Sequence, residues 1–507
     1  MSTTCRSALF TIVLLSLPAC MLDSGVDEPD EDTRISDFTL EDSDGAEPAP
    51  SGDSEDDESE PTPPGDSEDD EPEPEPEPEL DVDGDGWTEA GGDSDDSDPT
   101  VFPGAPELCD GKQNDSSMGG WTEASEDGVG TFFDDNGNIV DVSDLSGTFE
   151  LYSPGELRFC RGAWDLSYTV TGDDISIVGA GPDRTTLRSA SDSVIHAIGV
   201  TGLEISGLTL ERGTGTPCFG ELLCGGGLFL DSSEVELRDA LIADNTATHG
   251  GGLFVYRGAL ALSDVEIADN AALYGGGGVV YEGGSASIED TRILHNEAEG
   301  YGGGLFIVND SSAEISGLYL SDNVAESGGG LFIEYSQATL TDSVIAYNDA
   351  SVDGGGLWLL GSSATLSDTR VSDNTAVDGA GLWATTSDAV LSSSAFADNA
   401  AADEGGGLYL DSSSATLSDS EVSGGSANAG GGLYLYASEV SLSTSEISSN
   451  VANFLGGGLF LTYFSGVQVS DTDFSGNTDH DTYHDDAGRF YDWGASADFS
   501  CATTGCS

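Results

Sequence analysis

A glycine-rich triplet followed by an aliphatic residue occurs ten times between Cys224 and Phe460. Successive aliphatic positions are 25 or 26 residues apart, and a period this constant indicates one structural unit stacked on copies of itself. The positions are Leu228, Leu253, Val279, Leu305, Leu331, Leu357, Leu382, Leu408, Leu433 and Leu459. A stacked array displays columns of equivalent side chains, so the repeat constrains both the fold and the place of any binding surface.

Each unit consists of short runs with alternating polarity. In residues 250–270 these runs are centred on Phe254, Ala261 and Glu266, and Gly, Ser or Asp separates them. Alternation with period two indicates strands, and no unit has helical spacing. Three strands and three turns of about 25 residues form one coil of a right-handed parallel β-helix, with coils about 4.8 Å apart. The sequence therefore predicts an all-β, right-handed parallel β-helix of about 25–26 residues per coil, after a disordered acidic N-terminal linker. A leucine-rich repeat is the rival at this period, but Gly, Ser, Ala, Thr and Asp fill the positions that it reserves for leucine.

A column of asparagines stands 17 or 18 residues after most of the aliphatic positions, and Gly425 takes its place in one coil. Stacked asparagines at a tight turn can hydrogen-bond to one another along the stack, as side-chain ladders do in cross-β assemblies. The glycines suit a corner that needs positive φ and close backbone approach. The predicted ladder consists of Asn245, Asn270, Asn296, Asn323, Asn348, Asn374, Asn399, Asn450 and Asn477.

The coils combine the glycine-rich triplet with a segment such as Phe396-Ala-Asp-Asn399. This combination resembles the repeat of chlamydial polymorphic membrane proteins. The stretch from Ile175 to Gly181, and that from Gly199 to Leu210, is similar to the opening coils of the pectate-lyase-like β-helix superfamily. The resemblance covers roughly residues 145–507. It implies the fold and leaves the activity open, because this fold carries adhesins, lyases and hydrolases alike.

The N-terminal segment has the features of an export signal. Arg6 precedes an apolar run, and Leu17-Pro-Ala-Cys20 resembles a bacterial lipobox. Residues 1–19 are therefore predicted to be a lipoprotein signal peptide, with Cys20 as the lipidation site. The expected location is the outer membrane or cell surface through a lipid anchor, and secretion without an anchor is the alternative.

Residues 20–80 are acidic, rich in proline and poor in apolar residues, so they are expected to form a disordered stalk. The whole chain has 95 acidic and 13 basic residues, for a formal net charge of −82. Such a charge excludes nucleic acids and anionic membrane surfaces as natural partners and favours divalent cations or a saline habitat.

A calcium-like motif follows the stalk, in residues 81–120. Asp81, Asp83 and Asp85 occupy alternate positions before Gly86, as in an EF-hand type of loop. The wider stretch is similar to the metal-binding motif of surface proteins like MopE, although Ser94 and Ser116 stand where that family has cysteines. The predicted Ca²⁺ ligands are Asp81, Asp83, Asp85, Asp93 and Asp95, and a solvated acidic loop is the alternative.

Cysteine usage is that of an extracellular protein. Cys5 leaves with the signal and Cys20 takes lipid, so six cysteines remain for pairing. The expected disulfides are Cys218–Cys224, Cys501–Cys506 and, by elimination, Cys109–Cys160.

The residue after the repeat aliphatic position is aromatic in nine of the ten coils, and in the other coil it is Val280. Alternation puts these residues on the face opposite the leucines, and the mixed, charged column two residues further on suggests that this face is outside. The sequence thus predicts a solvent-facing aromatic stripe, with inverted faces or a covering by residues 120–145 as alternatives. The candidate ligand-binding residues are Phe306, Phe332, Trp358, Trp383, Tyr409 and Tyr434.

The coils offer no evident catalytic constellation, so enzymatic activity is not favoured. Arg238, Arg257, Arg292 and Arg370 fall in different registers, and the many acids make any pair unremarkable. His480 and His484 in the tail suit a polar end cap better than a metal site. We expect a non-enzymatic surface lipoprotein that binds glycans or surface proteins through a β-helix in residues 145–507, joined to the metal module by a connector at 121–144. A polysaccharide lyase or hydrolase and a structural surface-coat protein are the alternatives.

Overall fold

The structure, a computed structural model, describes residues 80–478 apart from 106, 110–111, 120–121, 135–137 and 144, together with two strands at 482–484 and 489–492. The predicted signal peptide, the lipidation site Cys20, residues 20–79 of the stalk, Cys501 and Cys506 lie outside the described residues. Within the described part, no helix is long and apolar enough to cross a membrane.

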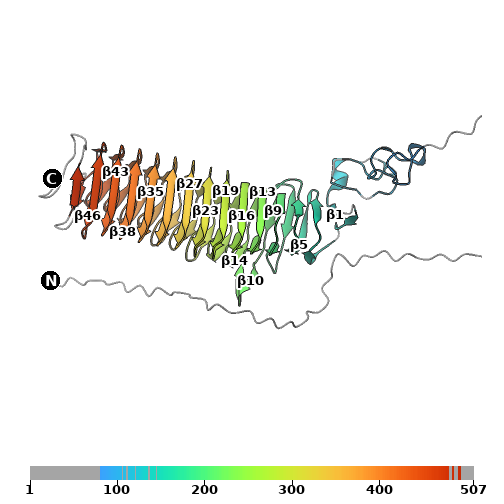
Figure 1. The fold of residues 1–507 in the computed structure, drawn as a ribbon, viewed down its shortest axis with the longest axis horizontal. Helices are drawn as coiled ribbons and strands as arrows, with labels where there is room; N and C mark the ends of the chain where they lie inside the picture. The colour runs from blue at the N-terminus through green and yellow to red at the C-terminus, as the bar shows by residue number, and fades with distance from the viewer. Residues whose placement is uncertain are drawn as a thin grey trace, which may run out of the picture. The chain divides into compact units, whose positions relative to one another are not determined.

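Short strands stack in parallel, coil upon coil, as Figure 1 shows. The first face of the coils contains the strands that begin at the repeat leucines, with their counterparts in the outer coils. It consists of β3 (Gly147–Leu151), β8 (Ile195–Ile198), β12 (Leu228–Asp231), β15 (Leu253–Tyr256), β18 (Gly278–Tyr281), β22 (Leu305–Val308), β26 (Leu331–Glu334), β30 (Leu357–Leu360), β34 (Leu382–Thr385), β38 (Leu408–Asp411), β42 (Leu433–Tyr436), β46 (Leu459–Thr462) and β49 (Thr482–His484).

The second face follows the first in every coil, and β5 (Gly162–Val170) pairs with strands of both faces. It consists of β4 (Gly155–Phe159), β6 (Ile175–Val178), β7 (Thr185–Arg188), β9 (Leu203–Glu211), β13 (Glu234–Ala243), β16 (Ala259–Ala268), β19 (Ser285–Glu289), β20 (Arg292–Leu294), β23 (Ser312–Ser316), β24 (Tyr319–Ser321), β27 (Gln337–Thr341), β28 (Val344–Ala346), β31 (Ser363–Ser367), β32 (Arg370–Ser372), β35 (Asp388–Ser392), β36 (Ala395–Ala397), β39 (Ser414–Ser418), β40 (Glu421–Ser423), β43 (Glu439–Ser443), β44 (Glu446–Ser448), β47 (Gly466–Ser470), β48 (Asp473–Ser475) and β50 (Arg489–Asp492).

The third face is a sheet of eleven short strands. It consists of β10 (Thr216–Phe219), β11 (Leu222–Cys224), β14 (Thr246–His249), β17 (Ala271–Tyr274), β21 (Glu297–Ala298), β25 (Val324–Ala325), β29 (Asp349–Ala350), β33 (Thr375–Asp378), β37 (Ala400–Glu404), β41 (Ser426–Ala429) and β45 (Val451–Leu455). At most three residues separate each of these strands except β10 from the glycine triplet that follows it, so the third face meets the first face at the glycine corner.

The predicted right-handed parallel β-helix is confirmed, but the three strands of each coil are distributed differently from the prediction. The second and third predicted runs both lie on the second face, where Asp264, at φ 53°, bends the chain within β16. The stretch after each asparagine, which the sequence assigns to a turn, forms the third face. Its strands escape prediction because several are only two residues long and mostly polar or small.

The leucine column faces the interior as predicted, and its side chains are almost completely buried. One coil is out of register by one residue: Gly278 pairs with both Leu253 and Leu305, and Val279 pairs with Phe254. The assignment of Val279 to the leucine column and of Val280 to the aromatic column is therefore wrong. A run of four glycines precedes Val279, so the sequence leaves two choices for the triplet.

The asparagine ladder is confirmed. From Asn245 to Asn374, each amide Nδ2 donates to Oδ1 of the next asparagine at 3.0 Å and also to a backbone carbonyl. In the coil where Gly425 replaces the asparagine, the backbone N–H of Gly425 donates to Oδ1 of Asn450 at 2.9 Å. The side chains are buried and their polar atoms are paired, which is the condition for keeping amides in a core.

Two ladders of hydroxyl side chains line the other corners, and the sequence analysis did not identify them. In one, which runs from Ser311 to Ser465, each backbone N–H donates to the serine Oγ of the next coil. The other runs from Thr369 to Thr472 in the same manner. These hydrogen bonds satisfy backbone donors at bends where the strand ladders are interrupted.

Two of the predicted disulfides are present. Cys109 and Cys160, with Cα atoms 5.2 Å apart, join the calcium-like motif of residues 81–120 to the first coils. Cys218 and Cys224, 5.8 Å apart, close the antiparallel hairpin of β10 and β11. Before the coils, β1 (Gly130–Asp134) pairs antiparallel with β2 (Ile139–Asp141) and with β4. Two 3₁₀ segments, η2 (Glu89–Gly91) and η3 (Glu123–Glu126), precede β1.

Candidate functional site

The aromatic column of the first face is mostly buried, which corrects the predicted solvent-facing stripe. Phe306, Phe332, Tyr409 and Tyr434 are 7%, 1%, 9% and 8% exposed, whereas Trp358 and Trp383 are only half-buried. The column does point away from the leucine interior, so the predicted order of the faces holds. The partly exposed rings of the column are those of Trp358, Trp383 and Phe460.

The third face covers this column. Residues that stand immediately before a glycine triplet pack against aromatic residues of this column in several coils. Tyr301, for example, contacts Phe332 and Trp358, with ring centroids 5.1 and 5.7 Å apart. His249 contacts Phe254 in the same way at 6.2 Å. The predicted covering by residues 120–145 is therefore replaced by a covering from the repeat itself.

The residues before the triplets form a column of their own, and its chemistry changes along the stack. From the N-terminal side the column reads Cys224, His249, Tyr274, Tyr301, Ser327, Asp353, Asp378, Glu404, Ala429 and Leu455. Backbone pairing between neighbouring coils places Asp353 beside Asp378, and Asp378 beside Glu404. Three carboxylates thus stand on successive coils, next to the part of the aromatic column that contains both tryptophans. We call this set the acid–aromatic strip: Asp353, Asp378, Glu404, Trp358, Trp383, Tyr409 and Tyr434.

The carboxylates of the strip are unusually basic. Burial, the charge of Asp378 and the charge of Glu326 raise the pKa of Asp353 to about 7. Burial and the charge of Asp378 raise the pKa of Glu404 to about 7, although hydrogen bonds from Tyr434 and Tyr409 oppose the shift. Burial, above all, raises the pKa of Asp378 to about 6, while its Oδ1 accepts the backbone N–H of Glu404 at 2.7 Å. The strip therefore titrates near neutral pH, unlike ordinary surface acids.

Two half-buried histidines lie near the aromatic column in the N-terminal coils. Burial lowers the pKa of His249 to about 4, and it lowers that of His196, which stacks on Phe229 at 4.4 Å, to the same value. Both imidazoles are neutral at pH 7 and act as aromatic packing. His480 lies outside the described residues, and His484 lies in β49.

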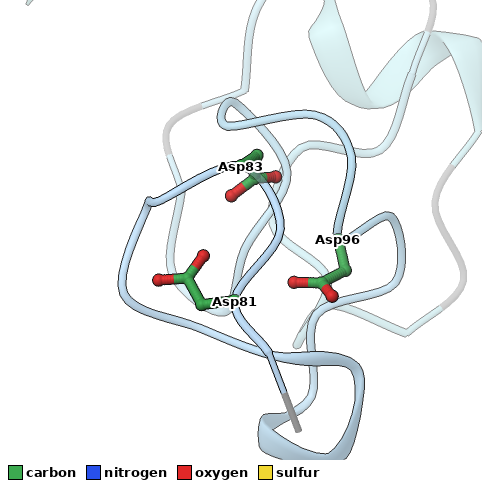
Figure 2. A group of neighbouring side chains, drawn as sticks. All are labelled: Asp81, Asp83 and Asp96. Carbon is green, nitrogen blue, oxygen red and sulfur yellow. The ribbon is translucent and has the colours of Figure 1, made fainter.

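The acidic module at residues 81–96 forms two groups of converging carboxylates. Asp83, Asp85 and Asp93 place one oxygen each within 4.8 Å of one another, and Asp81, Asp83 and Asp96 do the same. Figure 2 shows the second group, whose three side chains point toward a common centre. Asp83 belongs to both groups, so five carboxylates surround two adjacent positions.

The orientation of these carboxylates leaves oxygens without partners inside the first group. One oxygen of each side chain accepts a backbone N–H two residues ahead, which fixes the loop: Asp83 from Asp85, Asp85 from Trp87, and Asp93 from Asp95. The other oxygen of each is buried and has no hydrogen-bond partner. Asp93 as a whole is only 2% exposed. Burial and the charges of Asp85, Asp93 and Asp81 also raise the pKa of Asp83.

This donor set fits a hard divalent cation. Ca²⁺ prefers six to eight oxygen ligands, and unpartnered carboxylate oxygens are costly to bury without a cation. Asp81, Asp83, Asp85 and Asp93 lie in the two groups as the sequence predicts. Asp95 does not, because its Oδ1 accepts the hydroxyl of Ser97 at 2.7 Å, and Asp96 takes the place expected for it. A salt bridge from Lys112 to Asp98 at 2.5 Å lies close in sequence and lowers the pKa of Asp98 to about 2.

Residues 193–376, 278–425 and 380–491 match the family described as the right-handed beta helix region, and together they span more than half of the chain. The chain belongs to the right-handed β-helix family. No curated protein matches this β-helix significantly in sequence. Among solved structures, the A-module of the mannuronan C-5 epimerase AlgE6 from Azotobacter vinelandii is similar to it, with a TM-score of 0.26 and 11% identity over 71% of this chain and 92% of that module.

Sequence reasoning missed the carboxylates of the strip in this β-helix, although a signal for them exists. Asp353, Asp378 and Glu404 share one register, immediately before the triplet, and that column holds no other acid. With 95 acidic residues in the chain, a column becomes noticeable only after the third face is recognised. Asp96 gave no comparable signal, because convergence within a loop is not periodic.

Proposed function

We propose that this β-helix is a non-enzymatic surface protein that binds glycans or a protein partner at the acid–aromatic strip. The observation that carries the proposal is the pair of half-buried tryptophans, Trp358 and Trp383, beside three stacked carboxylates. Indole rings offer flat apolar surfaces to sugar rings, and carboxyl groups bond to hydroxyls. A site repeated at the coil spacing suits an extended chain better than a compact molecule.

The remaining parts of the chain complete this proposal. Cys20 would carry the lipid anchor in the outer membrane, and residues 20–80 would hold the β-helix away from the lipid. Secretion without an anchor is the alternative location. The acidic module would bind Ca²⁺ as a structural ion through Asp81, Asp83, Asp85, Asp93 and Asp96. The three unpartnered oxygens of its first group support this role.

A glycan-array screen of the full-length protein tests the binding function. We expect bound glycans to be lost from the double variant Trp358→Ala/Trp383→Ala and retained by Tyr319→Ala, which removes an aromatic side chain of the second face. Circular dichroism checks that all three proteins are folded. A folded wild-type protein that binds neither glycans nor cell-surface proteins would contradict the proposal and favour a structural surface coat.

A polysaccharide hydrolase or lyase is the second candidate, and the raised pKa values of Asp353 and Glu404 favour it. A carboxyl group with a pKa of about 7 can act as a general acid or base at neutral pH. Release of reducing or unsaturated sugar ends from a polysaccharide panel would establish this candidate. Loss of that release in Glu404→Gln would assign it to the strip.

A further inference from the structure

The aromatic stack is interrupted at one point within the strip. Phe332 contacts Trp358 at 4.4 Å, and Trp383 stacks on Tyr409 at 3.9 Å with nearly parallel rings. Trp358 and Trp383 are direct partners on neighbouring strands, β30 and β34, yet no ring contact joins them in the described part of the chain. Stacking continues on both sides of this break, through Phe306 and through Tyr434.

Polar groups without partners occur in the same two coils. Asp353 is 9% exposed, and its carboxylate accepts no hydrogen bond from any described residue. The Nε1 atom of Trp358 is buried and has no acceptor. An unpaired buried carboxylate and an unpaired indole N–H are both unfavourable, so native proteins usually place a ligand or water at such groups.

The charges around the break define the ligand. The groups that act electrostatically on Asp353 are Asp378 and Glu326, both acidic, so an anionic sugar would be repelled. A shared metal ion does not fit either, because in the described chain only residues 81–96 bring three acids within 4.8 Å of one another. An organic cation fits, since ammonium groups pair with carboxylates and are attracted to indole faces.

We propose that the break between Trp358 and Trp383 binds a hexosamine unit that carries a free amine, as part of a longer glycan. The ammonium group pairs with Asp353 and Asp378 and lies against an indole face, and the Trp358 ring turns on binding so that its N–H, which is buried in the free protein, donates to a ring hydroxyl. A lysine side chain lacks the second group, because its ammonium offers donors and no acceptor. This inference rests on the proposed glycan-binding function and specifies the sugar.

Isothermal titration of the full-length protein with three oligosaccharides of matched length tests the inference. The probes are an oligomer of glucosamine with free amines, its N-acetylated counterpart, and a neutral glucose oligomer. We expect the free-amine oligomer to bind at least about tenfold more tightly than the other two, as hydrogen bonds to charged groups imply. Equal affinities for all three, or no binding of any of them, would overturn the inference, whereas the proposed function is overturned only if the folded protein also binds nothing in the glycan array and no cell-surface protein.

Substitutions test whether the preference for the free-amine oligomer arises at the break between Trp358 and Trp383. Asp353→Asn keeps the shape and removes the charge, so the preference for the free amine should disappear, and Asp378→Asn should weaken it. Trp358→Phe should reduce the affinity for all three oligomers about two- to tenfold while the amine preference remains. Glu314→Gln, an exposed acid of the second face, is the matched control and should bind like wild type. An undiminished amine preference in folded Asp353→Asn would also overturn the inference.

Discussion

Aspartate at the corners accounts for part of the negative charge of this chain, 14 of its 95 acidic residues. Of the 30 non-glycine residues with positive φ in the described part, 14 are aspartates, and several stand directly before a buried asparagine or hydroxyl residue of a ladder. Left-handed backbone is unfavourable for most L-residues, but aspartate and asparagine tolerate it because their short polar side chains bond locally. The repeat therefore accumulates acidic residues for conformational reasons, independently of any ligand.

Asp419 provides a test at the residue scale. Its φ is 49°, and it precedes Ser420 of the hydroxyl ladder. We expect Asp419→Asn to leave the free energy of unfolding within about 0.5 kcal/mol of wild type. Asp419→Val should lower it by about 1–2 kcal/mol, because a β-branched side chain is strained in this region. Urea unfolding followed by circular dichroism measures both variants, and equal stabilities would show that the corner imposes no such constraint.

At the scale of single elements, the asparagine ladder is a continuous structural unit in which each side chain serves two coils. Replacing Asn348 by alanine removes the Oδ1 atom that accepts both the backbone N–H and the Nδ2 of Asn323. It also removes the donor to the carbonyl of Leu320. Because these groups are buried, we expect a loss of about 2–5 kcal/mol in the free energy of unfolding.

The matched control is Asn428→Ala, which removes an exposed amide that bonds to Ala402 and Asp403 in the third face. Its loss should change stability by no more than about 0.5 kcal/mol. Similar effects of both variants in urea unfolding would mean that burial in the ladder adds nothing to an ordinary surface hydrogen bond.

The elements differ in how far the sequence determines them. Leu253 and Asn270 could be placed correctly because strand alternation and a fixed spacing act within a single repeat. The burial of Phe332 could not be predicted, because it depends on Tyr301, which follows the two-residue strand β21 and pairs with the next coil only through an isolated bridge to Ser327. In the acidic module, the choice of Asp96 over Asp95 is made by the path of the loop, which no periodic pattern records.

The acidic module gives a prediction for cation binding. Ca²⁺ titrated into the full-length protein should bind at residues 81–96, and Asp93→Asn should weaken binding by about tenfold or more, because affinity follows the number of charged ligands. Asp95→Asn is the control, since that carboxylate lies outside both groups. Calorimetry measures the affinities. Equal loss in the two variants would indicate general charge attraction, and no heat with wild type would contradict the calcium proposal.

At the scale of the whole molecule, the β-helix supplies rigidity and the strip introduces a pH-sensitive element into it. Most coils pack leucine inside and aromatic residues outside, and the three carboxylates of the strip stand in place of residues that would pack without charge. Asp353, Asp378 and Glu404 have pKa values of about 7, 6 and 7 in the fold, against 3.8, 3.8 and 4.5 as ordinary values. The folded state thus binds more protons than the unfolded state between about pH 4 and pH 7.

This difference fixes the sign of the pH dependence. Stability contributed by the protonated carboxyls is fully present near pH 4 and is lost as the pH rises to about 7. The triple variant Asp353→Asn/Asp378→Asn/Glu404→Gln cannot lose protons, so its free energy of unfolding should exceed that of wild type at pH 8, by on the order of 2–3 kcal/mol, and match it near pH 4. Urea unfolding at several pH values measures the difference in unfolding free energy between the two proteins. The contribution of the many other acidic residues cancels in this difference, because both proteins contain them. If the two curves of unfolding free energy against pH run parallel, the strip is hydrated and unstrained. If the curves converge at low pH, this β-helix is less stable at neutral pH because it holds three carboxylates beside its tryptophans.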